Sequence, residues 1–228
     1  MKSVAGQDEN MNQSVNAPEA DWPRWLYAGD TALILEFGNT VHPSINAKVL
    51  AMATSIKKHK ILGFVEAVPA FRSISIYFDP LVTDHEQVKL ACTELPLETA
   101  ANLKPANVWQ IPVCYDSEFG LDLEETANVL DIGVDEVIQR HVDSDFRVYV
   151  LGFMPGFSFL GGLDKTLNLP RRKSPRKLVP RGSVAIAMGL GGVYPFDSPG
   201  GWHLLGKSPV KMYDGNREPA IFFEPGDG

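Results

Sequence analysis

The hydrophobic positions in the first half of the chain are spaced alternately as in strands and as in helices. Compact or alternating apolar runs predict strands, whereas apolar residues that recur every three or four positions predict helices. The expected elements, in chain order, are a strand at Thr31–Phe37, a helix at Pro43–His59, strands at Phe64–Pro69 and Ser73–Phe78, and a helix from Asp84 to Leu95. This β-α-β-β-α order predicts a small α+β domain over residues 22–103.

The pattern changes after a predicted linker at 102–107. We expect a strand at Val108–Cys114 and two short helices at Leu121–Leu130 and Asp135–Val142. Further along, short apolar runs alternate with glycine and proline: RVYVLGF, SVAIAMG, GGVYPF, WHLLGK, VKMYDG and AIFFEPG. Such spacing is typical of many short antiparallel strands, so residues 107–228 are predicted to form a barrel or a sandwich.

Composition and the first residues narrow the classes of function. Residues 1–21 are polar and lack periodicity, which predicts a disordered tail without the apolar segment of a signal peptide. No apolar run of about 18 residues occurs, so we expect a cytoplasmic protein that does not span a membrane. The net charge of −7 argues against binding to nucleic acid. Cys92 and Cys114 lie in apolar surroundings and are expected to be free thiols rather than a disulfide.

The octapeptide GWHLLGKS, Gly201–Ser208, fits the letters of the phosphate-binding loop G-x-x-x-x-G-K-[ST]. A true loop of this kind follows a buried strand and opens a helix whose amides face the phosphates. Here Pro209 follows directly, the next segment is too short for a helix, and Asp214-Gly215 predicts a hairpin turn. Because bulky apolar residues lie between the glycines, we expect GWHLLGKS to be a strand of the barrel.

Two other segments invite functional interpretations. Leu121–Val142 has the layout of a helix-turn-helix, but its acidic residues would repel phosphates, so a helical pair packed beside the barrel is favoured. The segment Arg171–Arg181 holds six cations and no acid. It is either a solvated loop or a site for a carboxylate or phosphate, which arginine binds in bidentate fashion.

Signatures of a self-contained enzyme are absent from the sequence. There is no G-x-S-x-G elbow, and the five histidines lack metal-ligand spacing, so no metal site is expected. His141 could act as a general base, although a capping or packing role is the favoured interpretation. The stretch Gly152–Gly162, GFMPGFSFLGG, is either a barrel corner or a loop whose amides approach a ligand.

Three long motifs follow one another in the second half of the chain: GFMPGFSFLGGLD, LPRRKSPRKLVPRGSVAIA and GVYPFDSPGGWHLLGKSP. Together with GDTALILEFG and IPVCYDSEFGLDLEETA, they resemble the family that comprises the B subunit of 5-oxoprolinase, the kinase inhibitor KipI and allophanate hydrolase subunit 1. The resemblance covers about residues 25–228. It implies an α+β N-terminal domain followed by a cyclophilin-like antiparallel β-barrel domain.

The resemblance also implies a non-autonomous enzyme subunit. With 5-oxoprolinase subunits C and A, it would hydrolyse 5-oxo-L-proline to L-glutamate at the expense of ATP, whose site is not assigned to this chain. The alternatives are inhibition of a sensor histidine kinase and a part in urea or allophanate breakdown. Family members usually continue past EPGD with another apolar strand, so we expect the barrel here either to lack that strand or to close differently.

The expected site residues come from the same resemblance. Arg171 or Arg176 is expected to pair with the substrate carboxylate or a phosphorylated intermediate, and His141 to carry a proton. Charge reversal at Arg176 is expected to abolish the activity of the complex without unfolding the protein. The amides expected to assist belong to Gly156, Gly200 and Gly201. Further matching positions without individual roles are Arg147, Pro155, Phe157, Pro180, Gly182, Ser183, Tyr194, Ser198, Pro199 and Trp202.

Overall fold

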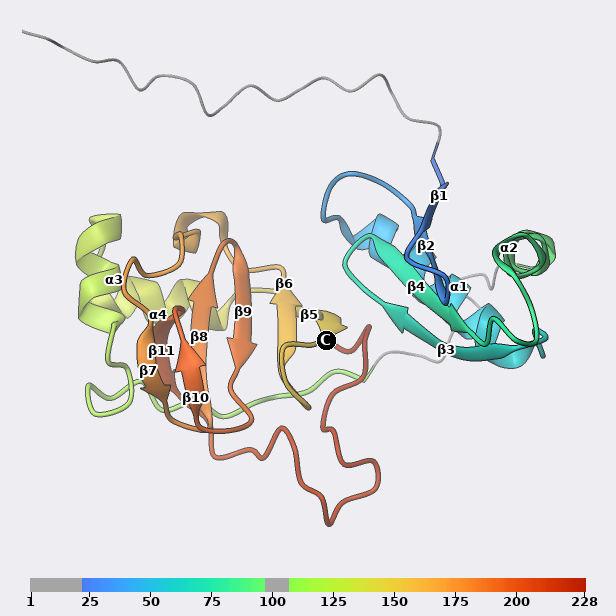
Figure 1. Cartoon of the computed structure of the whole chain (residues 1–228). Coiled ribbons are helices and arrows are strands. Elements are labelled where there is room, and N and C mark those ends of the chain that lie inside the picture. Colours follow the sequence, from blue (N-terminus) through green and yellow to red (C-terminus); the bar gives the residue numbers. More distant parts are fainter. Residues whose placement is uncertain (1–21, 97–106) are drawn as a thin grey trace, which may run out of the picture.

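The computed structural model of the chain describes residues 22–96 and 107–228, so the predicted tail and most of the predicted linker lie outside the described residues. Figure 1 shows two lobes, each with its own sheet. The elements of the N-terminal lobe are β1 (Arg24–Tyr27), β2 (Ala32–Glu36), α1 (Pro43–Lys58), β3 (Phe64–Pro69), β4 (Ser73–Phe78) and α2 (His85–Glu94).

The N-terminal strands form an antiparallel sheet in the order β1-β2-β4-β3, and both helices pack on one of its faces. Alternate residues of β4 point to that face, so Ile74 and Ile76 are fully buried beneath α1. Pro43 occupies the first turn of α1, and Asp84 caps α2 by accepting the amide of Gln87 at 2.9 Å. The predicted strands and helices of this lobe are confirmed, and β1 is an additional edge strand.

The C-terminal lobe contains two helices and two sheets. Its elements are α3 (Leu123–Leu130), α4 (Val134–Val142), β5 (Arg147–Leu151), β6 (Ser158–Gly161), the 3-10 turn η1 (Lys165–Leu167), β7 (Arg176–Val179), β8 (Ser183–Ala187), β9 (Leu190–Val193), β10 (Ser198–Gly200) and β11 (His203–Lys207). The larger sheet has the order β11-β8-β9-β6-β5, and β10 pairs with β7 in a separate ribbon. The prediction that GWHLLGKS forms a strand is confirmed by β11.

The cyclophilin-like barrel that the family resemblance implies is not confirmed. Within residues 22–96 and 107–228 no sheet closes on itself, and β11 and β5 remain the edge strands of the larger sheet. The predicted strand at Val108–Cys114 is an extended segment that forms a single bridge to β11, at Cys114. Pro112 lacks an amide hydrogen and cannot donate to a continuous ladder. The last two predicted strands likewise contribute one bridge, between Tyr213 and Ile221.

The larger sheet is covered on both faces. In β8, Val184 and Ile186 point to one face, on which α3 and α4 pack; we call it the helix face. Ala185 and Ala187 point to the opposite face, the aromatic face, which carries a cluster of large rings. The rings of this aromatic cluster are Phe157, Phe159, Tyr194 and Trp202. Because every residue of β8 is buried, SVAIA is a continuous apolar run without alternation.

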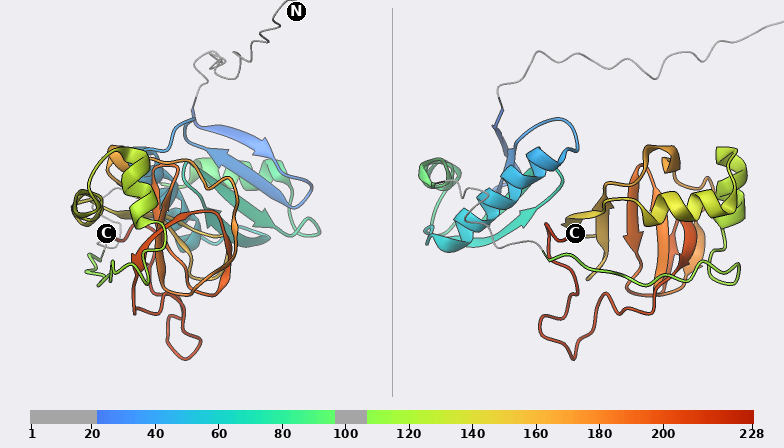
Figure 2. Two further views of the ribbon diagram at one scale, coloured as in Figure 1. Left: turned by 90° about the vertical axis from the view of Figure 1, so that its left-hand side faces the viewer. Right: turned by 180° about the vertical axis from the view of Figure 1, so that it is seen from behind.

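The two lobes contact each other through α1 and β5. Asn46 of α1 is fully buried, and its side-chain amide donates to the carbonyl of Tyr149 at 3.2 Å. Phe71 packs edge-on against Tyr149 and Phe159, with ring centroids 6.2 and 5.7 Å apart. Figure 2 shows from behind that β5 is the strand of the larger sheet nearest to the N-terminal lobe.

Both cysteines are free thiols, as predicted, with Cys92 buried and Cys114 half-buried. None of the helices in the described ranges has the length and apolar character needed to cross a membrane. In the same ranges, no group of three or more His, Cys, Asp or Glu side chains is arranged to hold a metal ion.

Candidate functional site

The structure does not bring the residues predicted to form one site to a single cavity. His141 lies on the helix face, near the end of α4, where it lines a cavity of about 550 Å³. None of the other predicted catalytic or anion-binding residues lines that cavity; they surround the aromatic cluster or the β7–β10 ribbon. Arg176 instead bonds Asp122 at the start of α3, so His141 and Arg176 do not line one cavity within the described part of the chain.

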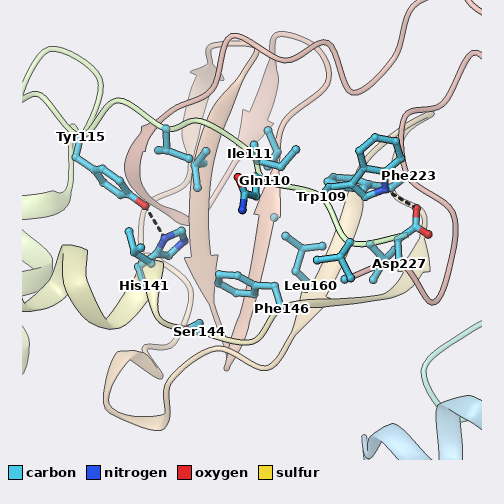
Figure 3. Close-up of a pocket in the computed structure, with 18 residues that line it drawn as sticks. Trp109, Gln110, Ile111, Tyr115, His141, Ser144, Phe146, Leu160, Phe223 and Asp227 are labelled. Atoms are coloured by element: carbon cyan, nitrogen blue, oxygen red, sulfur yellow. Dashed lines mark hydrogen bonds between the residues drawn. The ribbon is translucent and has the colours of Figure 1, made fainter. Parts of the chain in front are cut away.

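His141 is held in place by Tyr115. His141 is 6% exposed, and its Nδ1 lies 2.7 Å from the hydroxyl of Tyr115. The Tyr115 hydroxyl points towards the imidazole, and both residues line the cavity (Figure 3). Burial lowers the pKa of His141 to about 4 and raises the pKa of Tyr115 to about 12, so both groups are neutral at physiological pH. Two tautomers fit this contact: the hydroxyl donates to Nδ1 while the ring hydrogen sits on Nε2, or Nδ1–H donates to the hydroxyl oxygen while Nε2 is an acceptor.

This arrangement changes the role expected of His141. A neutral imidazole whose Nδ1 is already engaged with Tyr115 has only Nε2 left for a ligand in the cavity. With a pKa of about 4 it is also a weak proton acceptor at neutral pH. The low pKa does not favour a proton carrier at neutral pH, so that role stays a prediction, and the structure shows His141 as a buried hydrogen-bonding group.

The rest of the cavity is mainly apolar. Trp109, Ile111, Val113, Phe146 and Leu160 line it together with segments of β8 and β9 (Figure 3). Among the described residues that line it, the acidic side chain is that of Asp227, which is 3% exposed and accepts from the Trp109 indole at 3.0 Å. None of the described residues that line the cavity is Lys or Arg, so it offers no counter-charge for an anionic substrate.

The predicted anion-binding arginine Arg176 already has a carboxylate partner within the chain. Its guanidinium donates to both oxygens of Asp122, at 2.7 and 2.6 Å. Arg172 donates to the same carboxylate at 2.6 Å and to Glu125 at 2.6 Å. We call these four residues the arginine clasp. Asp122 is 1% exposed, the two arginine side chains are 22% and 23% exposed and Glu125 is exposed, so the clasp is a partly buried ion-pair network around Asp122 and not an open anion site.

The clasp fastens helix α3 to the edge of the larger sheet. Asp122 immediately precedes α3, and its carboxylate accepts the amide of Leu204 in β11 at 2.7 Å. Its own amide donates to the Leu204 carbonyl at 3.0 Å. Asp122 was not among the predicted site residues, because the predicted helix began at Leu121 and so placed this aspartate inside its first turn, whereas α3 begins at Leu123. It lies 50 or more residues from its two arginine partners, so sequence spacing could not reveal the pairing.

Arg171 differs from its neighbours because it is exposed, and it has no ion pair in the described ranges. Its charge acts on the Tyr194 hydroxyl, which packs beneath the turn at Gly200. A Cβ at Gly200 would overlap that hydroxyl, so glycine is required there for packing. Of the two arginines predicted to pair with an anion, Arg171 is the one without an acidic partner in the described part of the chain.

The remaining predicted residues have structural contacts. Phe157 and Trp202 are almost fully buried, and their rings lie 5.6 Å apart within the aromatic cluster. The Ser183 hydroxyl donates to the carbonyl of Pro180 at 2.7 Å. Gly156 has a φ of +82° and packs against the backbone of Met212, which explains its glycine. The other positions are exposed Pro155 and Pro199, half-buried Arg147, Pro180, Ser198 and Gly201, and buried Gly182.

Comparison with known proteins assigns the class. The family described as "Carboxyltransferase domain, subdomain C and D" matches residues 23–223, which is nearly all of the described chain. Among curated proteins, the B subunit of 5-oxoprolinase from Bacillus subtilis (strain 168) is 38% identical over 210 residues, covering 87% of this chain and 88% of that protein. The protein of the same name from Escherichia coli O157:H7 is 33% identical over 208 residues, covering 90% and 93%.

A solved structure agrees with this assignment. The crystal structure of TTHA0988 superposes with a TM-score of 0.78 and 38% sequence identity over 87% of this chain. This chain spans 39% of the length of TTHA0988. The chain carries the carboxyltransferase domain, and within that class it belongs to the family of 5-oxoprolinase B subunits.

Proposed function

We propose that this chain acts as the B subunit of an ATP-dependent 5-oxoprolinase, which hydrolyses 5-oxo-L-proline to L-glutamate together with subunits A and C. The observation that carries the proposal is the 38% identity to a protein named as the B subunit of 5-oxoprolinase, over 87% of this chain. The name of that relative implies further subunits, so this chain is a non-autonomous part of the enzyme. ATP binds at the level of the complex, and no residue of this chain is assigned to it.

The geometry supports a subunit that contributes to a shared site. His141 is neutral and buried, and its cavity offers no cation for the carboxylate of the substrate. Arg172 and Arg176 are neutralised by acids of the same chain. Arg171 could supply a counter-charge for a carboxylate substrate, but His141 is a poor proton carrier at neutral pH, so we expect the proton carrier to come from another subunit.

Reconstitution tests the proposal. The purified chain is mixed with subunits A and C, 5-oxo-L-proline and ATP, and glutamate and ADP are measured. Both products are expected only when all three proteins are present. A verified three-subunit complex that yields no glutamate would refute the proposal and would favour the alternatives, inhibition of a histidine kinase or a part in urea or allophanate breakdown.

A matched pair of variants tests the part played by Arg171. Arg171→Gln removes the exposed cation beside Tyr194, whereas Lys173→Gln removes an exposed cation two residues away. If Arg171 holds the substrate carboxylate, Arg171→Gln lowers kcat/KM by about tenfold or more and Lys173→Gln leaves it unchanged. Equal activity of the two variants would show that Arg171 does not bind the substrate. The result of the reconstitution experiment would still stand.

A further inference from the structure

A second hollow, of about 440 Å³, lies at the end of β11, away from the cavity at His141. It is formed by residues 180–182 before β8, by Asp197 before β10, by Lys207 at the end of β11 and by residues 208–210 after it. Lys207 and Ser208 are the last two letters of GWHLLGKS. The strand places them at one polar hollow, although the backbone has none of the geometry of a phosphate-binding loop.

Two cations that line this hollow lack an acidic partner. Neither Arg181 nor Lys207 forms an ion pair shorter than 4.0 Å with any acid in the described ranges. The Lys207 ammonium rests 5.4 Å from the ring centroid of Phe119, which restricts its position without neutralising its charge. These two side chains therefore contrast with Arg172 and Arg176, whose charges are balanced within the arginine clasp.

A buried hydroxyl adds a donor to the hollow. Ser208 is 2% exposed, and its Oγ accepts the amide of Val210 at 3.2 Å. The hydrogen of this hydroxyl has no acceptor within the described part of the chain, so it is available to a ligand. A buried donor in this state favours a ligand that brings an acceptor oxygen.

The backbone around the hollow is rigid. Gly182, with a φ of +82°, donates its amide to the carbonyl of Tyr194 at 2.7 Å, and its own carbonyl accepts the amide of Ser208 at 2.8 Å. A Cβ at Gly182 would come within 2.5 Å of the Ser208 carbonyl and 3.5 Å of the Lys207 stem. The amide of Arg181 donates to Asp197 at 2.7 Å. Because these amides are already used, a ligand can be held only by the side chains.

We propose that Arg181, Lys207 and Ser208 bind a small oxyanion, a carboxylate or a phosphate group, in the hollow at the end of β11. Two unpaired cations and one free hydroxyl supply charge-assisted donors for its oxygens. Asp197 is the one acid that lines the hollow, and it leaves a net positive lining. A lining with two cations and one acid suits one small anion better than a polyphosphate. The inference concerns binding to this chain alone and does not depend on the proposed enzymatic activity.

Titration calorimetry on the full chain at low ionic strength tests the proposal, with sodium phosphate, 5-oxo-L-proline and glutamate as separate probes. Saturable binding of at least one probe is expected. Comparing the Kd values of the three probes shows whether phosphate or carboxylate is preferred. Lys207→Gln and Arg181→Gln should each raise the Kd about tenfold or more. Lys177→Gln, an exposed cation of β7 that does not line the hollow, should leave it unchanged.

Asp197→Asn gives a readout that a purely structural role would not produce. Removing the like charge should lower the Kd several-fold, opposite in direction to the effect of the cation variants. Melting temperatures measured in parallel confirm that each variant is folded. The proposal is overturned if no probe binds saturably, or if the Kd of the folded Lys207→Gln and Arg181→Gln variants equals that of the unchanged protein.

Discussion

Replacing Asp122 by asparagine removes the negative charge of the arginine clasp while keeping the size of the side chain. The carboxylate accepts four hydrogen bonds, two from Arg176, one from Arg172 and one from the Leu204 amide. An asparagine has one acceptor oxygen, so its NH₂ group must face donors that already point at the site. Both arginines are left half-buried without a full counter-charge.

Two independent estimates give the loss in free energy of unfolding that Asp122→Asn should cause. Breaking one side of a buried ion pair costs about 3–5 kcal/mol, because the remaining charge is desolvated and unpaired. Losing two of the four hydrogen bonds, at about 1.5–3 kcal/mol each for charged groups, gives a similar range. For a protein of this size, 3–5 kcal/mol corresponds to a fall in Tm of about 6–20 °C.

Urea unfolding followed by tryptophan fluorescence measures the effect, since Trp202 is buried in the aromatic cluster. The matched control is Glu124→Gln, which removes an exposed acid next to the clasp and should change the free energy of unfolding by less than about 0.5 kcal/mol. If Asp122→Asn loses no more than this control, the clasp does not fasten α3 to the sheet and the reasoning fails.

Three further predictions concern single buried contacts. Since the pKa of His141 is about 4 when folded and about 6.5 when unfolded, protonation favours the unfolded chain, so stability is complete above about pH 6.5 and falls by about 3 kcal/mol towards pH 4. His141→Phe should flatten this part of the urea-unfolding profile. Gly162→Ala should cost about 2 kcal/mol or more, because φ is +94° and a Cβ would overlap the Asp145 carbonyl. Asn46→Ala should cost about 1–3 kcal/mol by leaving buried carbonyls without a donor.

Each of these predictions has a matched comparison. The pH effect is contradicted if the unchanged protein and His141→Phe lose stability in parallel between pH 6.5 and 4. Gly133→Ala, at a glycine with a φ of −70° and no atom near its Cβ position, should be tolerated, and an equal loss at both glycines would argue against steric strain. Asn128→Ala, at an exposed position of α3, controls for Asn46→Ala.

The N-terminal lobe could be predicted from sequence because its elements are locally determined. The apolar positions of β4 alternate towards one covered face, and a capping aspartate marks the start of α2. The C-terminal lobe was predicted less completely, because some of its strands pair with strands that are far away in the sequence or pair irregularly. The ribbon of β7 and β10 was missed because a cation-rich segment and a Ser-Pro-Gly turn show no apolar alternation.

The candidate site was predicted less well than the fold, for a physical reason. Sequence motifs identified the arginines as potential anion ligands, and arginine does suit that role. What they could not show is that Asp122 reaches the same place from 54 positions away and satisfies Arg176 first. A cation becomes a binding residue only when no acid of its own chain neutralises it, and that depends on tertiary packing. Arg171, Arg181 and Lys207 meet this condition in the described part of the chain, and Arg172 and Arg176 do not.

Charge reversal at Arg176 was expected to abolish activity without unfolding, but the contact with Asp122 leads us to expect a loss of folding instead. Arg176→Glu would set a second carboxylate against Asp122, which is 1% exposed, and two buried acids at that distance repel strongly. The variant is therefore expected to lose the packing of α3 on β11, so a loss of activity would report unfolding and not a lost substrate contact. Functional tests of the basic segment consequently belong at Arg171 and Arg181, which are exposed and can be neutralised without disturbing a buried partner.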